Sequence, residues 1–235
     1  MARASQLSRS LSAEPDSPLS PDLSLLSEFL ALAGCGAAAP QYASHVLREK
    51  RTLGATLASG DFELARLGLP AAGRRMIGML RDAVTLSLRR EIEDRPCLTS
   101  GPALLNYLHA SMAHAPTESL RVLFLDARNR LLRDELMVEG GIDQTPMFVR
   151  EILKRALEVG ATGLILVHNH PSGDPSPSKG DVEATHALAV AAAPLGVEVH
   201  EHLIVARCGF SSLRALGLLG RAGHWQEPAV ISVAA

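Results

Sequence analysis

The chain has 235 residues, of which 47% are hydrophobic and 20% charged, and its formal net charge is −2 at pH 7. This composition is typical of a folded globular protein and excludes a disordered one. The net charge offers no general attraction for polyanions, and an aromatic content of 3% leaves few rings on which single-stranded bases could stack.

Residues 1–22 are rich in Ser, Leu and Pro and predict a mobile tail. An organelle-targeting segment is the alternative, because Arg3 and Arg9 precede the first acidic residue, Glu14. The segment lacks the basic stretch, apolar run and cleavage site of a secretory signal. Since no run approaches the roughly 18 apolar residues of a membrane span, and three scattered cysteines favour a reducing compartment, we expect a cytoplasmic protein without membrane contact.

The next segment, 23–93, predicts a small helical domain. Its Ala- and Leu-rich stretches are interrupted by glycine and proline, and residues 74–90 carry apolar side chains at helical spacing. Residues 91–102 contain Pro96 and Pro102 and predict a linker, which places a domain boundary there.

Residues 103–225 predict an α/β domain, because patterns typical of strands alternate with patterns typical of helices. Strands are expected at 118–126, 131–138, 163–167 and 197–205, and helices at 146–159 and 181–195.

Candidate metal ligands follow the apolar strand at 163–167. His168 and His170 are two residues apart, so a strand would direct both rings to one face. A turn rich in Pro and Gly leads to Ser178, where a helix should begin, and Asp181 follows three residues later. Two neutral imidazoles and one carboxylate are ligands typical of a catalytic zinc site whose fourth position is open to water. Alternatively, Ser178 and Asp181 only form a capping box at the helix start.

The string HNHPSGDPSPSKGD at 168–181 and the strand HLIV at 202–205 resemble the RadC family, a branch of the JAMM or MPN+ metalloproteases. The resemblance covers about residues 103–222. It implies a mixed-sheet, deaminase-like α/β fold and a zinc-bound water that hydrolyses a peptide or isopeptide bond in an unknown protein or peptide substrate. The family usually has Asp where this chain has Glu201, a difference that concerns the support of the fold more than the metal.

A zinc hydrolase also needs a carboxylate that takes a proton from water. The resemblance assigns this role to Glu118, which shares a strand face with the apolar row that begins at Leu120. Glu135 and Glu139 on the next strand are alternative candidates. The resemblance also implies that Ser178 hydrogen-bonds the developing oxyanion.

Two other histidine patterns fit metal chemistry less well. His200 and His202 repeat the His-x-His spacing, but no acidic residue at a helix start accompanies them, so a second metal site is not expected. The tripeptide HNH at 168–170 is also unlike an HNH nuclease, in which the three residues are spread over a ββα unit.

A DNA-associated or protein-binding factor with a structural zinc is the competing hypothesis. RadC proteins often carry an N-terminal domain that resembles helix-hairpin-helix DNA-binding modules, and residues 64–90 look like a weakened version. Pro70 removes an N–H group from the turn that would hold a phosphate. Weak, salt-sensitive DNA binding could still come from Arg74, Arg75, Arg81, Arg89 and Arg90.

Overall fold

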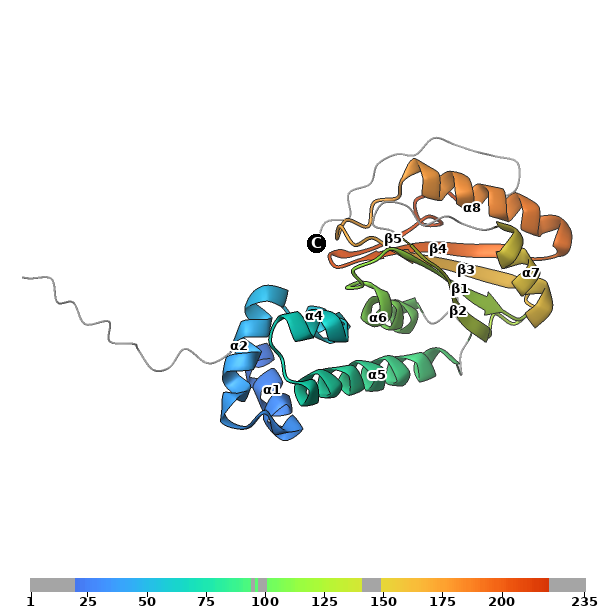
Figure 1. The fold of residues 1–235 in the computed structure, drawn as a ribbon. Coiled ribbons are helices and arrows are strands. Elements are labelled where there is room, and N and C mark those ends of the chain that lie inside the picture. The colour runs from blue at the N-terminus through green and yellow to red at the C-terminus, as the bar shows by residue number, and fades with distance from the viewer. Residues whose placement is uncertain (1–19, 94–95, 97–100, 141–148, 220–235) are drawn as a thin grey trace, which may run out of the picture.

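The computed structural model describes residues 20–93, 96, 101–140 and 149–219. Figure 1 shows a helical region at one end and a sheet with covering helices at the other. The predicted tail at 1–22 lies outside the described residues up to position 19. The chain is already helical from Pro21, and the Ser20 side chain caps this first helix by accepting from the Leu23 N–H group.

Within residues 20–93, the described part of the N-terminal region, there are five α-helices: α1 (Pro21–Leu30), α2 (Ala39–Lys50), α3 (Leu53–Ala58), α4 (Asp61–Arg66) and α5 (Ala71–Glu93). Two short irregular turns, η1 (Ala31–Cys35) and η2 (Gly36–Ala38), join α1 to α2. The apolar faces of these helices meet in one buried cluster that includes Leu26, Leu30, Ala43, Val46, Leu64, Leu69 and Ile77.

The helical stretch 21–50 is the one described segment whose length and apolar composition would allow it to cross a membrane, contrary to the expectation that no such segment exists. Its backbone is not one continuous α-helix, because Gly34 has a φ of 90° and Gly36 a φ of 58°. The regular helices on either side have 10 and 12 residues. Each is shorter than the roughly 20 residues that a membrane-spanning helix needs.

The C-terminal region is built on a mixed five-stranded sheet. Its strands are β1 (Ser119–Leu125), β2 (Leu131–Glu139), β3 (Gly163–Asn169), β4 (Glu198–Ala206) and β5 (Gly209–Ser212), in the order β2-β1-β3-β4-β5. Strands β3 and β4 are parallel, and the other neighbouring pairs are antiparallel. The prediction of an α/β fold with a mixed sheet is therefore confirmed.

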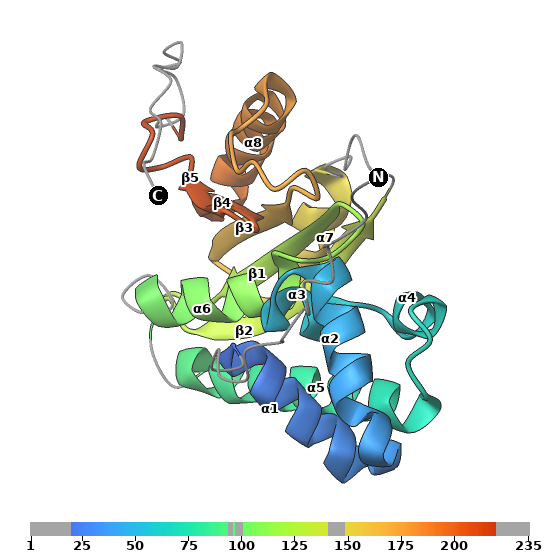
Figure 2. The ribbon, with the colours of Figure 1, turned by 90° about the vertical axis from the view of Figure 1, so that its left-hand side faces the viewer.

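Helices cover both faces of this sheet (Figures 1 and 2). Helix α6 (Gly101–Met112) packs on one face, together with the end of α5. Helices α7 (Val149–Val159) and α8 (Lys179–Ala192), the latter continued by the turn η4 (Ala193–Leu195), pack on the other. The second face carries the even-numbered core residues Leu120, Val122, Phe124, Leu164 and Leu166. Because side chains alternate along a strand, Glu118 and His168 belong to this second face.

The predicted linker at 91–102 overlaps a helix at each of its ends. Helix α5 continues to Glu93, and α6, which was not predicted, begins at Gly101. Pro102, the last residue of the predicted linker, lies in the first turn of α6, where its missing N–H group costs nothing. The short strand β5 was also not predicted, and residues 146–148 of the predicted helix at 146–159 lie outside the described part of the chain.

A buried carboxylate joins α6 to the sheet. The Asp134 side chain, fully buried on β2, accepts from Arg121 Nη1 of β1 at 2.7 Å and from the hydroxyl of Tyr107 on α6. Burial, followed by the charge of Asp134, raises the pKa of Tyr107 above its ordinary value, so the phenol stays protonated and donates.

We expect Asp134→Ala to lower the free energy of unfolding by about 3–5 kcal/mol, because it leaves a partly buried guanidinium without its partner. Tyr107→Phe, which removes only a hydroxyl, should cost about 1 kcal/mol. Urea unfolding followed by circular dichroism would measure both changes. Equal stability of the wild-type and Asp134→Ala proteins would contradict this account.

Candidate metal centre

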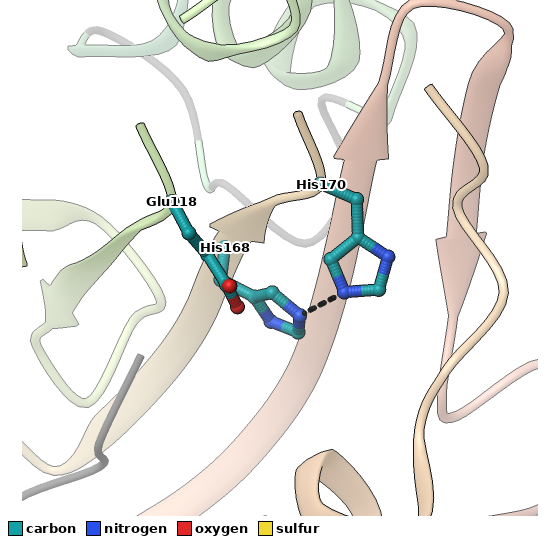
Figure 3. Close-up of side chains that lie close together, drawn as sticks. All are labelled: Glu118, His168 and His170. Carbon is teal, nitrogen blue, oxygen red and sulfur yellow. Dashed lines mark hydrogen bonds between the residues drawn. The ribbon is translucent and has the colours of Figure 1, made fainter. Parts of the chain in front are cut away.

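Three side chains with metal-binding atoms meet where β1 begins and β3 ends (Figure 3). Glu118 directly precedes β1, His168 lies in β3, and His170 follows it. One ligand atom from each lies within 4.8 Å of the others, and the two Nε2 atoms of the histidines are 2.9 Å apart. Among the described residues this is the one group of three or more potential ligands that lie so close together.

The register of the sheet explains why Glu118 meets the histidines. Leu120 of β1 lies directly opposite His168 of β3 in an antiparallel pair. Two residues earlier on the same face, Glu118 is therefore the diagonal neighbour of His168. Glu118 is buried, with 7% of the residue exposed.

Asp181 completes the group from the first turn of α8. Its Oδ1 atom lies 3.4 Å from His168 Nε2, and its Oδ2 atom lies 3.8 Å from His170 Nε2. The fold thus brings together all four residues proposed from the sequence as ligands or base, although they come from three separate segments.

Asp181 and Ser178 form a capping box as well. Asp181 Oδ2 accepts from the backbone N–H and from the hydroxyl of Ser178, both at 2.7 Å, and the Asp181 N–H donates to Ser178 Oγ at 3.1 Å. The cap uses Oδ2, and Oδ1 is the oxygen nearer to His168. The two interpretations of Asp181 are therefore compatible, since one oxygen caps the helix while the other faces the imidazoles.

The carboxyl group of Asp181 is held in its ionised form. Burial alone would raise its pKa, but a protonated His168, through its hydrogen bond and charge, together with the hydrogen bonds from Ser178, outweighs burial and brings the pKa below its ordinary range. An ionised carboxylate is the form that binds a metal.

Each imidazole has a partner for its second nitrogen. His170 Nδ1 lies 2.8 Å from the backbone oxygen of Asp174, and His168 Nδ1 lies 2.7 Å from Nε2 of His202. Metal-binding histidines usually make such a contact with the nitrogen that does not bind the metal. Burial, and next the charge of His168, lower the pKa of His202 well below its ordinary value.

Asn169, between the two histidines, holds the start of β1. Its Oδ1 atom accepts from the backbone N–H of Ser119 at 3.0 Å and from the Ser119 hydroxyl at 2.7 Å, and its Nδ2 atom donates to the Thr117 oxygen at 3.0 Å. Thr117 and Ser119 flank Glu118 on both sides. This fully buried amide therefore fixes the backbone that carries Glu118 beside the histidines.

Glu135 and Glu139, the two other candidates for the general base, form hydrogen bonds away from the histidines. Glu135 accepts three hydrogen bonds from Arg155 at 2.6–3.1 Å, and these bonds, with the positive charge, lower its pKa. Glu139 accepts from the Thr117 hydroxyl at 3.4 Å. Of the three candidate bases, Glu118 is the one that lies with the histidines.

Sequence reasoning missed the role of His202. The sequence suggests His200 and His202 only as a second metal site. In the structure the β3–β4 register shifts at His200, because Leu164 pairs with Val199 and Ile165 with Glu201, and the two histidines therefore have different neighbours. His200 packs over Gly163, where a Cβ atom would lie 2.4 Å from its Nε2 atom, whereas His202 contacts His168. A parallel pairing of the apolar strands at 163–167 and 197–205 would have brought His202 next to the strand that carries His168, and this pairing is the signal that could have revealed His202.

Glu201, where the resembling family usually has Asp, supports the end of the sheet. Its carboxylate accepts from the Ser212 hydroxyl at 2.7 Å and from the backbone N–H groups of His202 at 2.8 Å and Arg214 at 3.2 Å. These contacts hold β5 and the turn after it against β4.

The region that carries these residues matches a known protein family. Residues 98–218, about half of the chain, match the family model for the RadC-like JAB domain. The chain is also 50% identical over 131 residues to a UPF0758 protein from Rhodobacter capsulatus. That alignment covers 56% of this chain and 61% of the relative, so the chain spans about three fifths of the length of the curated relative that it matches.

Proposed function

Since this chain belongs to the family of RadC-like JAB domains, we propose that it is a zinc-dependent hydrolase that cleaves a peptide or isopeptide bond. The observation that carries the proposal is the approach of the two Nε2 atoms to 2.9 Å, with both Nδ1 atoms hydrogen-bonded elsewhere. Imidazole nitrogens so close together, beside a carboxylate, are arranged for a shared cation.

The donor set fits zinc. Two imidazoles and one carboxylate are typical of catalytic zinc sites, in which three protein ligands leave a fourth position open. His168, His170 and Asp181 would hold the ion, with the Oδ1 atom of Asp181 facing it because Oδ2 caps α8. The second nitrogen of each histidine already has the outer partner that such ligands need.

When bound, zinc supplies a Lewis acid that polarises a carbonyl group and makes water nucleophilic near neutral pH. In our proposal Glu118 accepts the proton of the attacking water and passes it to the leaving amine. Two observations support this role: a Glu118 carboxylate oxygen lies within 4.8 Å of the histidine nitrogens, and Asn169 hydrogen-bonds the backbone on both sides of Glu118.

Ser178 would stabilise the negative charge that develops on the scissile carbonyl oxygen. Its hydroxyl hydrogen is donated to Asp181 Oδ2, so this role requires the hydroxyl to rotate toward the substrate. The backbone N–H of Ser178 would keep the cap in place during that rotation.

The proposed activity can be tested without knowing the natural substrate. The zinc-loaded protein is incubated with a proteome-derived peptide library and with synthetic peptides branched at a lysine side chain, and new amino groups are identified by mass spectrometry. We expect cleavage that a chelator abolishes and added zinc restores.

The control for this assay is the His168→Ala/His170→Ala protein, prepared in parallel. Cleavage at an equal rate by this variant would identify a contaminating peptidase and contradict the proposal. Absence of any zinc-dependent cleavage in either substrate set would also contradict it and favour the DNA-associated or protein-binding factor.

DNA binding through residues 64–90 is kept as a weaker prediction. Arg74 donates to Asp61, Arg81 to Asp82 and Arg89 to Glu93, so three of the five arginines have acidic neighbours. A duplex would have to compete with these contacts, and its phosphates would bind weakly and in a salt-sensitive way.

A further inference from the structure

A chain of three hydrogen bonds runs behind the candidate metal centre, from His168 to the backbone of Asp181. His168 Nδ1 lies 2.7 Å from His202 Nε2, and His202 Nδ1 lies 2.5 Å from the hydroxyl oxygen of Thr185. That hydroxyl lies 2.5 Å from the backbone oxygen of Asp181, one turn earlier in α8. The side chains of His168, His202 and Thr185 are each at most 3% exposed, so water does not compete for these bonds.

The last of the three hydrogen bonds, from Thr185 to the Asp181 backbone, determines the direction of the other two. A backbone oxygen can only accept, so the Thr185 hydroxyl hydrogen is donated to Asp181. The Thr185 oxygen must then accept from His202 Nδ1, which therefore carries a hydrogen. A neutral imidazole with a hydrogen on Nδ1 has a lone pair on Nε2, so His202 accepts from His168 Nδ1.

The same logic leaves Nε2 without a hydrogen when the His168 ring is neutral. His170 is in the equivalent state, because its Nδ1 atom donates to the backbone oxygen of Asp174. With both rings neutral, two lone pairs face each other across 2.9 Å, beside the Asp181 carboxylate. A proton or a metal ion between the two nitrogens makes this arrangement favourable.

We propose that His202 and Thr185 are positioning residues that hold His168 in the ring orientation and tautomer required for metal binding. The proposal rests on the zinc site of the proposed function and adds two residues that do not contact the ion. Because this series of hydrogen bonds ends on the backbone of Asp181, it also connects His168, the proposed ligand on β3, to Asp181, the proposed ligand on α8. A neutral imidazole supplies the acceptor without adding a second buried negative charge.

Zinc affinity tests the proposal. Competition with a chromophoric chelator would give the zinc dissociation constant of the full chain and its variants. We expect His202→Leu, which removes the acceptor, to weaken zinc binding by about 10- to 100-fold. Thr185→Val, which keeps the side-chain shape, should weaken binding by a smaller factor, while Thr185→Ser and His202→Gln should retain much of the affinity because they keep a hydroxyl or an acceptor.

His200→Leu is the matched control, since it makes the same substitution two residues away on β4, outside the hydrogen-bond chain. Thermal unfolding of the metal-free proteins separates a folding defect from a local effect. Equal zinc affinity of wild type, His202→Leu and Thr185→Val would overturn the positioning role. Absence of zinc binding by the wild type would instead overturn the proposed function.

A second measurement reads the tautomers directly and requires no variant. Nitrogen-15 spectra of the imidazoles in the wild-type protein, with and without zinc, should show His202 protonated on Nδ1 and unprotonated on Nε2 in both forms. A purely structural role would not require one tautomer of His168. Protonation of His202 on Nε2 would overturn the proposal whether or not zinc binds.

Discussion

Replacing His168 and His170 together with alanine is expected to reduce bound zinc from about one ion per chain to almost none. The two imidazoles contribute two of the three proposed ligands, and their Nε2 atoms converge to 2.9 Å. One carboxylate cannot hold zinc tightly at micromolar concentrations of the ion. Elemental analysis of protein dialysed against zinc-depleted buffer gives the stoichiometry.

The single substitution Asp181→Ala should also lower the zinc content, but with a further effect. It removes the capping box of α8, which is worth about 1 kcal/mol, so the metal-free variant should unfold more readily than the metal-free wild type. Ser178→Ala serves as the comparison, because it weakens the cap and keeps the carboxylate. Full zinc retention by the double histidine variant would exclude this site as the metal centre.

The second large effect is expected from Glu118→Gln. The amide has the size of the carboxylate but cannot accept a proton, so hydrolysis should fall by about 10²- to 10⁴-fold while zinc content and stability stay close to those of the wild type. Activity of the zinc-loaded variant on the substrates identified with the peptide library measures the loss.

Glu135→Gln is the control for that substitution. Glu135 is bound by Arg155 from α7, so its replacement should weaken the contact between β2 and α7 and leave the activity largely intact. Loss of zinc together with activity in Glu118→Gln would show that Glu118 is a ligand and not the base.

The sheet and the helices of the α/β region could largely be predicted from the sequence, because their apolar periodicity is regular. The expected strand at 131–138 is observed at Leu131–Glu139, and the expected strand at 197–205 at Glu198–Ala206. Helix α6 was missed because Pro102 is equally compatible with a linker and with the first turn of a helix, and only packing against the sheet distinguishes them.

The candidate metal centre could be predicted only where its residues are close in sequence. His168, His170 and Asp181 fall within one short motif, whereas the contact of His202 with His168 depends on a parallel strand pair. The participation of Glu118 came from the resemblance, and strand alternation alone could not decide between it and Glu135. The antiparallel register of β1 against β3 distinguishes them in the structure.

The hydrogen bonds around His168 and Asn169 also determine when the metal centre can form during folding. Asn169 holds Ser119, 50 residues earlier, and His168 is supported by His202, 34 residues later. Such long-range contacts form late, because the chain must first close the loops between them. Before β3 pairs with β4, the chain already carries His168 and His170, but His202 does not yet contact His168. If the protein binds zinc as we propose, we expect tight zinc uptake only at the last stage of folding, after the central three strands have assembled.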